Sequence, residues 1–216
     1  HSLLRHDVQN GMMVIDSRAE IMRDELDGRN EEFATTILSR AREISDQIDR
    51  IRTALDTLTD GTDTEPVDLS GLLTDRVRAF RSNYPEVTVD ADVDDDLRVA
   101  ADDILDDVLA NLLRNAVEHN DKEQVEIEVT ATDTDDGVRV AVADNGPGIP
   151  ADERDQVFRR GVSNAQAGGP GGSGFGLFFI DTMVDSYGGD VRVEDNDPEG
   201  ARFVVTLPED NDGFDS

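Results

Sequence analysis

The chain has 216 residues, and its 50 acidic residues against 20 basic ones give a formal net charge of −30 at pH 7. This charge argues against binding to a nucleic-acid backbone or to an anionic membrane surface, because both depend on clustered Lys and Arg. The lack of cysteine excludes disulfides and thiolate metal sites. No run of 18 apolar residues occurs in the sequence, so we expect no membrane insertion and a cytoplasmic location for this segment, while a full-length protein could be soluble or membrane-attached.

The acidic residues are expected on solvent-facing surfaces. Apolar residues make up 37% of the chain and recur at regular periods, which argues against a disordered acidic polymer. At molar salt the Debye length falls to ~3 Å, so repulsion among the acids would be screened. Many acids with a single lysine, Lys122, are typical of a cytoplasmic protein from a halophile. An acidic interaction surface in a mesophile is the alternative interpretation.

Residues 1–59 are predicted to form a hairpin of two helices with a polar turn at 27–30. In both helices the apolar residues recur at alternating steps of four and three, the pattern of a heptad seam. Two antiparallel helices of this kind cannot bury both apolar stripes against each other alone. Pairing with a second copy into a four-helix bundle is the simplest solution, so we expect a homodimer. The polar segment 60–67 is predicted to be a linker.

The segment 68–208 is predicted to be one α+β domain, followed by an acidic tail over 209–216. Some segments have helical periodicity and others alternate, and Asp135-Asp136-Gly137 signals a hairpin. This mixture favours helices packed on one face of a mostly antiparallel sheet. The helices are expected over 69–83, 102–119 and 175–187, and the strands over 87–91, 97–100, 125–132, 138–144, 190–194 and 202–207.

His6 is a candidate nucleophile in the first helix. It lies two residues from Leu4 and two from Val8, about 200° around the helix from these seam residues, so it is expected on the outer face. A histidine with a pKa near ~6.5 is mostly neutral at pH 7 and can act as a nucleophile. Asp7 could hold one ring nitrogen as N–H, and Asn10 lies one turn further on the same side. A surface histidine with no function is the alternative.

A second group of polar residues recurs on one face of the helix predicted over 102–119. Asn111, Asn115 and His119 are spaced four residues apart, with apolar residues on the opposite face. Asparagine is a poor residue for a helix interior, so its repetition suggests a function. Its amide oxygen can ligate Mg²⁺, and its N–H groups can bind phosphate. A polar solvent-facing surface is the alternative.

Two glycine-containing segments complete the set. Asp144 ends a predicted strand at Asp-Asn-Gly-Pro-Gly, where its carboxylate can accept a hydrogen bond from an exocyclic amine such as that of adenine. Residues 172–177, Gly-Ser-Gly-Phe-Gly-Leu, open a helix, where backbone N–H groups can approach phosphates. Each motif alone is weak. A simple turn explains the first, and the second lacks the features of a dinucleotide fingerprint and of a P-loop.

The order and spacing of these segments resemble the sensor histidine kinases of two-component signalling. Residues 4–10, Leu-Arg-His-Asp-Val-Gln-Asn, resemble the H box of that family. The N, G1 and G2 boxes resemble residues 111–120, 144–148 and 172–177, and the F box and ATP lid resemble 157–161 and 161–172. The resemblance extends over residues 1–207. The form of the H box and the acidity are similar to haloarchaeal members.

The resemblance implies an ATP- and Mg²⁺-dependent protein histidine kinase. Its fold would be a dimerisation and phosphoacceptor hairpin followed by an α/β-sandwich ATP-binding domain of the histidine kinase, gyrase and chaperone superfamily. The phosphoryl group would pass from ATP to His6 and then to an aspartate of a response regulator, with phosphatase activity toward that regulator as a further expectation. Because the chain begins at His1 rather than Met, we expect a sensor domain upstream in a longer protein.

The resemblance also implies a role for each matching residue. His6 would accept the phosphoryl group, Asp7 would orient it and take its proton, and Asn10 would position phosphate or water. Asn115 would ligate Mg²⁺. The other residues would surround the nucleotide: Asn111, Gly172, Gly174, Gly176 and Leu177 at the phosphates, Asp144 with Gly146 and Gly148 at the adenine, Phe158 as the anchor of the lid, and Arg159 or Arg160 at the γ-phosphate.

The chain departs from the family pattern at two positions. Glu118 stands where many relatives have a basic residue that contacts phosphate, and His119 stands where an aromatic residue is common and could stack on or hydrogen-bond the nucleotide. A hydrolytic ATPase of the same superfamily is a competing interpretation. Such enzymes carry a Glu at the position of Asn111, and an amide cannot act as the base. An inactive dimeric scaffold is the third interpretation.

Overall fold

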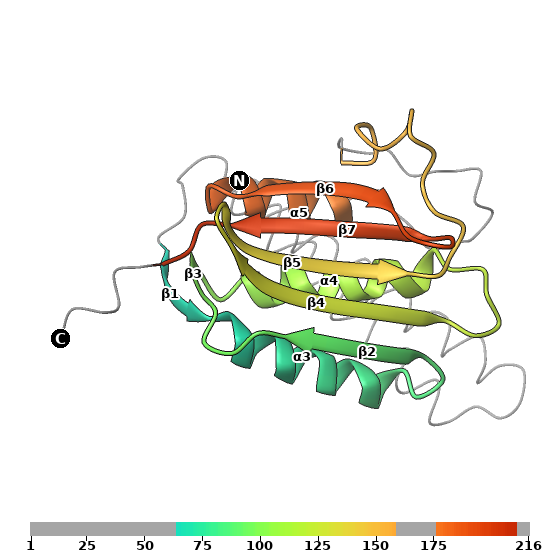
Figure 1. Ribbon diagram of the computed structural model, residues 1–216, viewed down its shortest axis with the longest axis horizontal. Coiled ribbons are helices and arrows are strands. Elements are labelled where there is room, and N and C mark those ends of the chain that lie inside the picture. The colour runs from blue at the N-terminus through green and yellow to red at the C-terminus, as the bar shows by residue number, and fades with distance from the viewer. Residues whose placement is uncertain (1–63, 159–175, 211–216) are drawn as a thin grey trace, which may run out of the picture. The chain divides into compact units, whose positions relative to one another are not determined.

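A computed structural model of the chain describes residues 64–158 and 176–210. These residues form a five-stranded sheet with helices on one face and a small two-stranded sheet beside it (Figure 1). The arrangement confirms the predicted α+β class for this part of the chain. The expected helical hairpin, most of the expected linker, the expected lid and the tail beyond residue 210 lie outside the described residues.

The larger sheet is mostly antiparallel, as predicted. The strands are β1 (Glu65–Asp68), β2 (Thr88–Val93), β3 (Arg98–Ala101), β4 (Glu126–Thr134), β5 (Gly137–Asp144), β6 (Asp190–Asp195) and β7 (Ala201–Leu207). Five of them follow the spatial order β2-β4-β5-β7-β6, in which β2 and β4 are parallel and the other neighbours antiparallel. The small sheet pairs β1 with β3.

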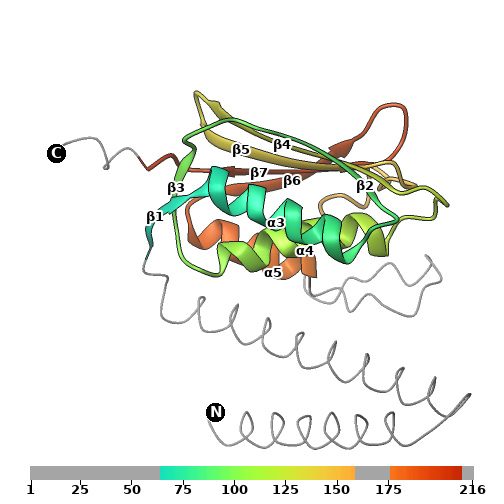
Figure 2. The same ribbon diagram turned by 90° about the horizontal axis from the view of Figure 1, so that it is seen from below.

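Three helices lie on the same face of the larger sheet, namely α3 (Leu69–Asn83), α4 (Leu105–Glu118) and α5 (Gly176–Ser186) (Figures 1 and 2). The Asp68 side chain caps α3 by accepting a 3.0 Å hydrogen bond from the Gly71 N–H. The apolar side of α4 is buried against the sheet, and this burial supplies the main driving force for its position. Within the described ranges, no helix combines the length and hydrophobicity needed to cross a membrane.

The helix-facing side of the sheet supplies the rest of the core. In β4, Ile127, Val129 and Ala131 are buried, and the residues between them point to the opposite face. β5 is buried along nearly its whole length. Its valines join the core, while Ala141 and Ala143 are buried on the face away from the helices.

Two element boundaries differ from the sequence prediction. Residues 65–67 were expected in the linker but form β1 together with Asp68, because these residues pair with β3 across the chain. α4 begins at Leu105 rather than at 102, because the Asp102 side chain accepts a 3.0 Å hydrogen bond from the Ile104 N–H ahead of the first turn. The hairpin predicted between β4 and β5 is confirmed, and Gly137 has a φ of 116° at its end.

Candidate functional site

The polar face of α4 meets the first residue of α5. Asn111 and Asn115 lie one turn apart and are only 1% and 8% exposed. Gly176 lies over both amides, since a Cβ at Gly176 would be 3.5 Å from Asn115 Oδ1 and 3.7 Å from Asn111 Oδ1. The fold therefore brings together two asparagines and a glycine that were predicted to belong to one site.

Asn111 uses both ends of its amide inside the protein. Its Nδ2 donates to the Asp107 carbonyl oxygen at 2.7 Å, and its Oδ1 accepts a hydrogen bond from the Arg114 guanidinium. Arg114 also forms an ion pair with Glu118 at 3.5 Å. Glu118, one of the two departures from the family pattern, thus holds Arg114 beside Asn111. The phosphate contact of Asn111 stays a prediction.

Asn115, in contrast, has an unsatisfied amide. Its Nδ2 is buried and has no hydrogen-bond partner among the described residues. Such a group costs ~1–3 kcal/mol, so we expect a ligand to satisfy it. An oxygen acceptor would bind the N–H, or the amide could turn its oxygen toward a cation. The described residues contain no cluster of three or more His, Asp or Glu that could hold a metal alone, so a cation here would depend on oxygens of a bound molecule.

Asp144 ends β5 with a buried carboxylate that is 8% exposed. Its Oδ1 accepts hydrogen bonds from the N–H groups of Gly146 at 2.8 Å and Ala201 at 3.4 Å. Burial raises the pKa of the Asp144 carboxyl, although both backbone donors and the nearby His119 act in the opposite direction. Both hydrogen-bond donors found in the described part of the chain bind Oδ1 of Asp144. Oδ2 is therefore the oxygen that could accept a hydrogen bond from a ligand.

The two glycines after Asp144 are required by close contacts. A Cβ at Gly146 would be 2.9 Å from Asp144 Oδ1, so a side chain there would displace the carboxylate. Gly148 has a φ of +72°, and its Cβ would be 2.9 Å from the carbonyl oxygen of Gly200. The loop is therefore fixed between the carboxylate and the turn that precedes β7.

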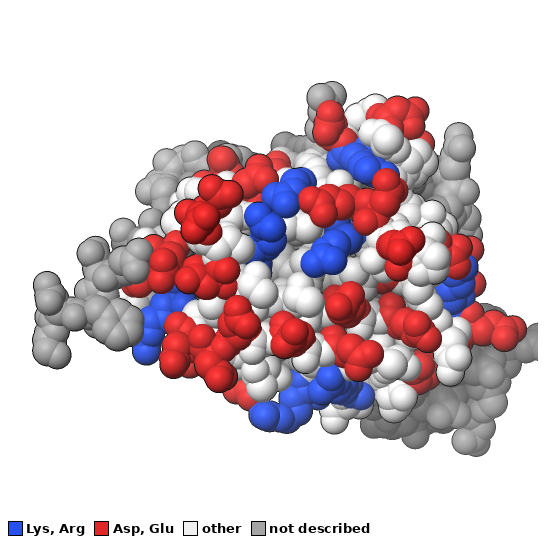
Figure 3. Space-filling model, in the orientation of Figure 1, with Lys and Arg blue, Asp and Glu red and all other residues white. Residues whose placement is uncertain are grey.

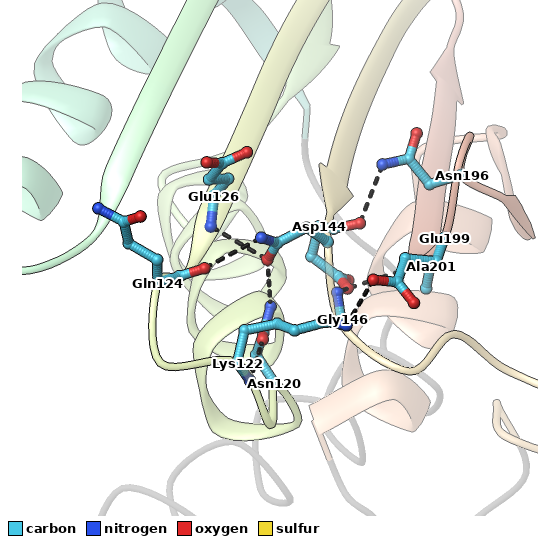
Figure 4. A network of polar contacts seen from close by, with 10 residues as sticks. Asn120, Lys122, Gln124, Glu126, Asp144, Gly146, Asn196, Glu199 and Ala201 are labelled. Carbon is cyan, nitrogen blue, oxygen red and sulfur yellow. Dashed lines mark hydrogen bonds and ion pairs between the residues drawn. The ribbon is translucent and has the colours of Figure 1, made fainter.

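An amide network ties this loop to the end of α4 (Figure 4). Asn145 Oδ1 accepts from Asn120 Nδ2 at 2.9 Å and from the Glu126 N–H at 3.1 Å. Asn145 Nδ2 donates to the Gln124 carbonyl oxygen at 3.0 Å. The sequence analysis did not select Asn120 or Asn145. The signal for Asn145 was its place in Asp-Asn-Gly, because asparagine often hydrogen-bonds the backbone in such turns.

The turn between β6 and β7 holds the loop from its other side (Figure 4). Asn196 Nδ2 donates to the Asp144 carbonyl oxygen at 2.9 Å, and Ala201 supplies the second donor to the carboxylate. Lys122 forms an ion pair with Glu199 of the same turn. These residues were not predicted from the sequence, because the partners lie up to 77 positions apart and the turn carries no motif.

Three other predicted residues lie near this region of the chain. Phe158 is partly buried against the core, with its ring edge-on to Phe203 at a centroid distance of 6.4 Å. Leu177 on α5 is also partly buried, and exposed His119 follows the last residue of α4. Their contacts with a nucleotide stay predictions. The predicted site residues that fall outside the described residues are His6, Asp7, Asn10, Arg159, Arg160, Gly172 and Gly174.

Residues 100–211, which contain Asn111, Asn115, Asp144 and Gly176, match the family of "Histidine kinase-, DNA gyrase B-, and HSP90-like ATPase" domains. The chain belongs to this ATPase family. The membership supports ATP as a ligand of this domain. It also agrees with the predicted superfamily of the fold.

The curated relatives of this ATPase-family chain include sensor histidine kinases. It is 39% identical over 104 residues to Sensor histidine kinase DpiB of Escherichia coli (strain K12), and this alignment covers 47% of the chain and 19% of the relative. It is 30% identical over 195 residues to Sensor-type histidine kinase PrrB of Mycobacterium leprae (strain TN), and this alignment covers 84% of the chain and 40% of the relative. The chain thus spans less than half the length of either relative.

Solved structures of histidine kinases share the fold of this ATPase-family chain. The mycobacterial sensor histidine kinase MprB has a TM-score of 0.60 and 28% sequence identity, over 68% of this chain and 97% of MprB. Histidine kinase ThkA in complex with response regulator protein TrrA has a TM-score of 0.67 and 22% identity, over 97% of this chain and 60% of that one. At that identity the second likeness concerns the fold alone.

Proposed function

We propose that this chain is the kinase core of a two-component protein histidine kinase, which transfers the γ-phosphoryl group of ATP to its own His6. The family match and the sensor kinase relatives support the proposal. The observation that favours a kinase over a hydrolytic ATPase is the side chain of Asn111. An amide cannot activate water as a general base, and both ends of this one are bonded to Asp107 and Arg114.

The proposed nucleotide site is framed by Asp144, Asn115 and Gly176. Asp144 Oδ2 would accept the exocyclic amine of adenine, within a loop shaped by Gly146 and Gly148. The backbone of the segment ending at Gly176 would approach the phosphates. The remaining proposed contacts are those of Asn111, Gly172, Gly174 and Leu177 with the phosphates, of Arg159 or Arg160 with the γ-phosphate, of His119 with the nucleotide and of Phe158 with the lid.

Mg²⁺ fits this site as the partner of the triphosphate. The side-chain oxygen of Asn115 would hold it, since that amide is buried next to Gly176 and its nitrogen makes no hydrogen bond in the described part of the chain that would prevent the amide from turning its oxygen toward the ion. Phosphate oxygens and water would complete the coordination that Mg²⁺ prefers. The bound ion would supply neutralisation of the phosphate charge, which a chain with a net charge of −30 otherwise repels.

In the proposed reaction a ring nitrogen of His6 attacks the γ-phosphorus, and the bond from that phosphorus to the departing ADP oxygen breaks. Asp7 would hold the other ring nitrogen and accept the proton that the imidazole loses. An aspartate of a response regulator would then take the phosphoryl group. Asn10 would position phosphate or water in a phosphatase reaction. This chain shares the fold of the histidine kinase ThkA, and the solved complex of ThkA with response regulator TrrA supports this choice of partner.

The chain would work as a homodimer within a longer, cytoplasmic sensor protein. The heptad seam of residues 1–59 supports the dimer, and the short alignment with longer relatives supports a sensor domain outside this chain. Ile48→Asp, which places a charge on the seam, should yield monomers or unfolded protein in high salt. Light scattering that finds an unchanged dimer would overturn the bundle without affecting the nucleotide site.

Incubation with γ-labelled ATP tests the kinase proposal. We expect the label to appear on the chain, to be labile in acid and stable in base, and to be absent from His6→Gln. Free labelled phosphate without labelled protein would instead indicate a hydrolytic ATPase. Nucleotide binding without labelled protein or released phosphate would indicate an inactive scaffold. Unchanged labelling of His6→Gln would overturn the assignment of His6.

The metal and the acidic surface can be tested on the same protein. We expect EDTA to weaken ATP binding sharply, since Asn115 alone cannot neutralise the triphosphate. We also propose a halophilic protein, so ATP affinity should improve as salt rises from low concentration and screens the acids. Indifference to EDTA would argue against Mg²⁺, and affinity that only falls with added salt would argue against the halophilic assignment.

A further inference from the structure

Within residues 64–158 and 176–210, no helix or strand covers the face of the five-stranded sheet opposite α3, α4 and α5 (Figures 1 and 2). Alternate side chains of each strand point to this face, and the strand register identifies them. No Asp or Glu occurs among those of two adjacent inner strands, β5 and β7, although the chain has 50 acidic residues. The outward residues of these strands are Arg139, Ala141, Ala143, Arg202, Val204 and Thr206.

Acidic residues border this region on both sides. β4, the neighbour of β5, contributes Glu126 and Glu128, with Glu128 opposite Ala143. β6, the neighbour of β7, contributes Asp190 and Glu194 on either side of Arg192, with Glu194 opposite Arg202. Figure 3, which views this face, shows basic side chains near its middle with acidic ones among and around them. The outward residues of β5 and β7 thus form an acid-free strip that carries two arginines between two acid-bearing strands.

Two of the central arginines lack a carboxylate partner among the described residues. Arg202 reaches only Thr130 Oγ1, at 3.5 Å, and Arg139 has a buried Nε with no hydrogen-bond partner in the described part. Arg192, in contrast, pairs with Glu194 at 2.8 Å. Other described arginines also form ion pairs: Arg76, Arg78, Arg114 and Arg154. A guanidinium that loses water without gaining a partner is unfavourable, so Arg139 and Arg202 are poised for an anion.

Small uncharged residues separate the two arginines. Ala141 lies opposite Val204, Ala143 lies opposite Arg202, and Arg139 lies opposite Thr206. Ala141, Ala143 and Val204 are at most 2% exposed and do not belong to the helix-side core. They therefore lie beneath the longer side chains of this face, where arginine stems can cover them. An incoming segment could approach the sheet and contact both guanidinium groups at once.

We propose that this surface, the arginine face (Arg139, Arg192 and Arg202 over Ala141, Ala143 and Val204), docks a carboxylate-bearing segment of a partner protein. Charge complementarity carries this choice, because unpaired guanidinium groups bind carboxylates in bidentate pairs. A nucleic acid is disfavoured, since the acidic strands on both sides would repel an extended phosphate backbone. A second copy of the same face would bring arginines against arginines.

The arginine face lies on the side of the sheet opposite α4 and α5, which carry Asn115 and Gly176. Partner docking and ATP binding can therefore be measured separately. The test uses the full chain at about 0.15 M salt, where the Debye length is ~8 Å. The probe is a synthetic peptide of alternating Glu and Ala, followed through the Nε–Hε NMR resonances of the arginines. A single-stranded oligothymidylate of matched charge is the second probe.

We expect the acidic peptide to shift the Arg139 and Arg202 resonances selectively. The double variant R139A/R202A should bind it about fivefold more weakly, because each ion pair at a surface contributes a fraction of a tenfold effect. R78A/R98A removes the same charge from other described surfaces and should bind the peptide as the unmodified chain does. ATP affinity should be unchanged in both variants.

Three results would overturn this inference. The first is that the resonances of Arg139 and Arg202 do not respond to the peptide at millimolar concentration while the chain is folded. The second is that the control double variant loses as much affinity as R139A/R202A, which would indicate general charge attraction. The third is that the oligothymidylate binds in place of the peptide, which would indicate a nucleic-acid surface. None of these results bears on His6 labelling, so they are distinguishable from failure of the kinase proposal.

Discussion

Gly200 lies directly against the carbonyl oxygen of Asp144. A Cβ on Gly200 would be 1.8 Å from that oxygen, and the residue has a φ of +123°. Gly200→Ala should therefore displace the turn before β7 and weaken the donation from the Ala201 N–H to the Asp144 carboxylate. We expect the free energy of unfolding to fall by ~2 kcal/mol or more, with a parallel loss of ATP affinity. Urea denaturation and nucleotide titration measure the two effects.

Gly188→Ala is the matched control for Gly200→Ala. Gly188 also has a positive φ, +75°, but its Cβ would meet only Pro208 Cγ, at 3.7 Å. This variant should lose ~1 kcal/mol of stability from backbone strain alone and should keep its ATP affinity. Equal losses of ATP affinity in the two variants would show that the contact with Asp144 does not determine the binding site.

Asp144→Asn should separate stability from binding. Burial raises the pKa of Asp144 in the folded protein, so the folded state binds the proton more tightly than the unfolded state. The free energy of unfolding therefore falls as the pH rises from the unfolded pKa of ~3.9 through the raised value. Asn does not ionise, so the free energy of unfolding of the variant does not fall over this pH range. The variant should therefore be at least as stable as the unmodified chain at pH 7. Its ATP affinity should fall about tenfold or more, because a hydrogen bond to a charged acceptor is replaced.

Asp181→Asn provides the comparison for Asp144→Asn. Burial, with smaller contributions from Asp185 and Asp190, also raises the pKa of Asp181 on α5. Its replacement should change the pH dependence of stability with the same sign and leave ATP affinity intact. Unfolding curves of the three proteins between pH 3 and pH 7, together with ATP titrations, distinguish the cases. Retained ATP affinity in Asp144→Asn would remove Asp144 from the adenine site.

Asn115→Ala and Asn111→Ala should differ in stability although the residues lie one turn apart. Asn111 makes two hydrogen bonds within the protein, so its removal should cost ~1–2 kcal/mol. The Asn115 nitrogen has no partner in the described part of the chain, so Asn115→Ala should cost less. Asn115→Ala should nevertheless lose metal-dependent ATP binding. A larger stability loss in Asn115→Ala than in Asn111→Ala would contradict this assignment.

The sequence predicted the local features of the domain well, because they depend on residues close together in the chain. Periodic apolar residues located α4 and placed Asn111 and Asn115 on one face, and alternation located β4 and β5. The prediction was wrong where pairing across the chain decides the structure. β1 exists because of β3, and its four residues show no pattern of their own.

The same limit applied to the site. Spacing selected Asn115 and Asp144 as candidates, but it could not show that the Asn111 amide is bonded to Arg114 while the Asn115 nitrogen has no partner within the described residues. Nor could it find Gly200, whose importance comes from contact with a carbonyl group far along the chain. These facts depend on how separate segments meet, and one sequence does not contain that information.

Tyr187→Phe tests the connection between the ends of α4 and α5. The buried Tyr187 hydroxyl donates to Asp102 Oδ1, the same oxygen that accepts from the Ile104 N–H ahead of α4. The variant keeps the ring but leaves the carboxylate with one donor fewer. We expect a loss of ~1–2 kcal/mol in the free energy of unfolding at pH 7. Tyr84→Phe is the control, since that ring stacks on Phe80 at 4.5 Å and has no described hydroxyl partner.

The loss in Tyr187→Phe should also depend on pH. Burial first, and then the bond to Asp102, raise the pKa of Tyr187 above its ordinary value. The stabilisation from the neutral hydroxyl is complete below the unfolded pKa of ~10 and is lost as the pH rises through the folded value. The difference in unfolding free energy between the unmodified chain and Tyr187→Phe should therefore shrink above pH ~10. A difference that stays constant into the alkaline range would show that the phenol ionises equally in the folded and unfolded states, contrary to the raised pKa.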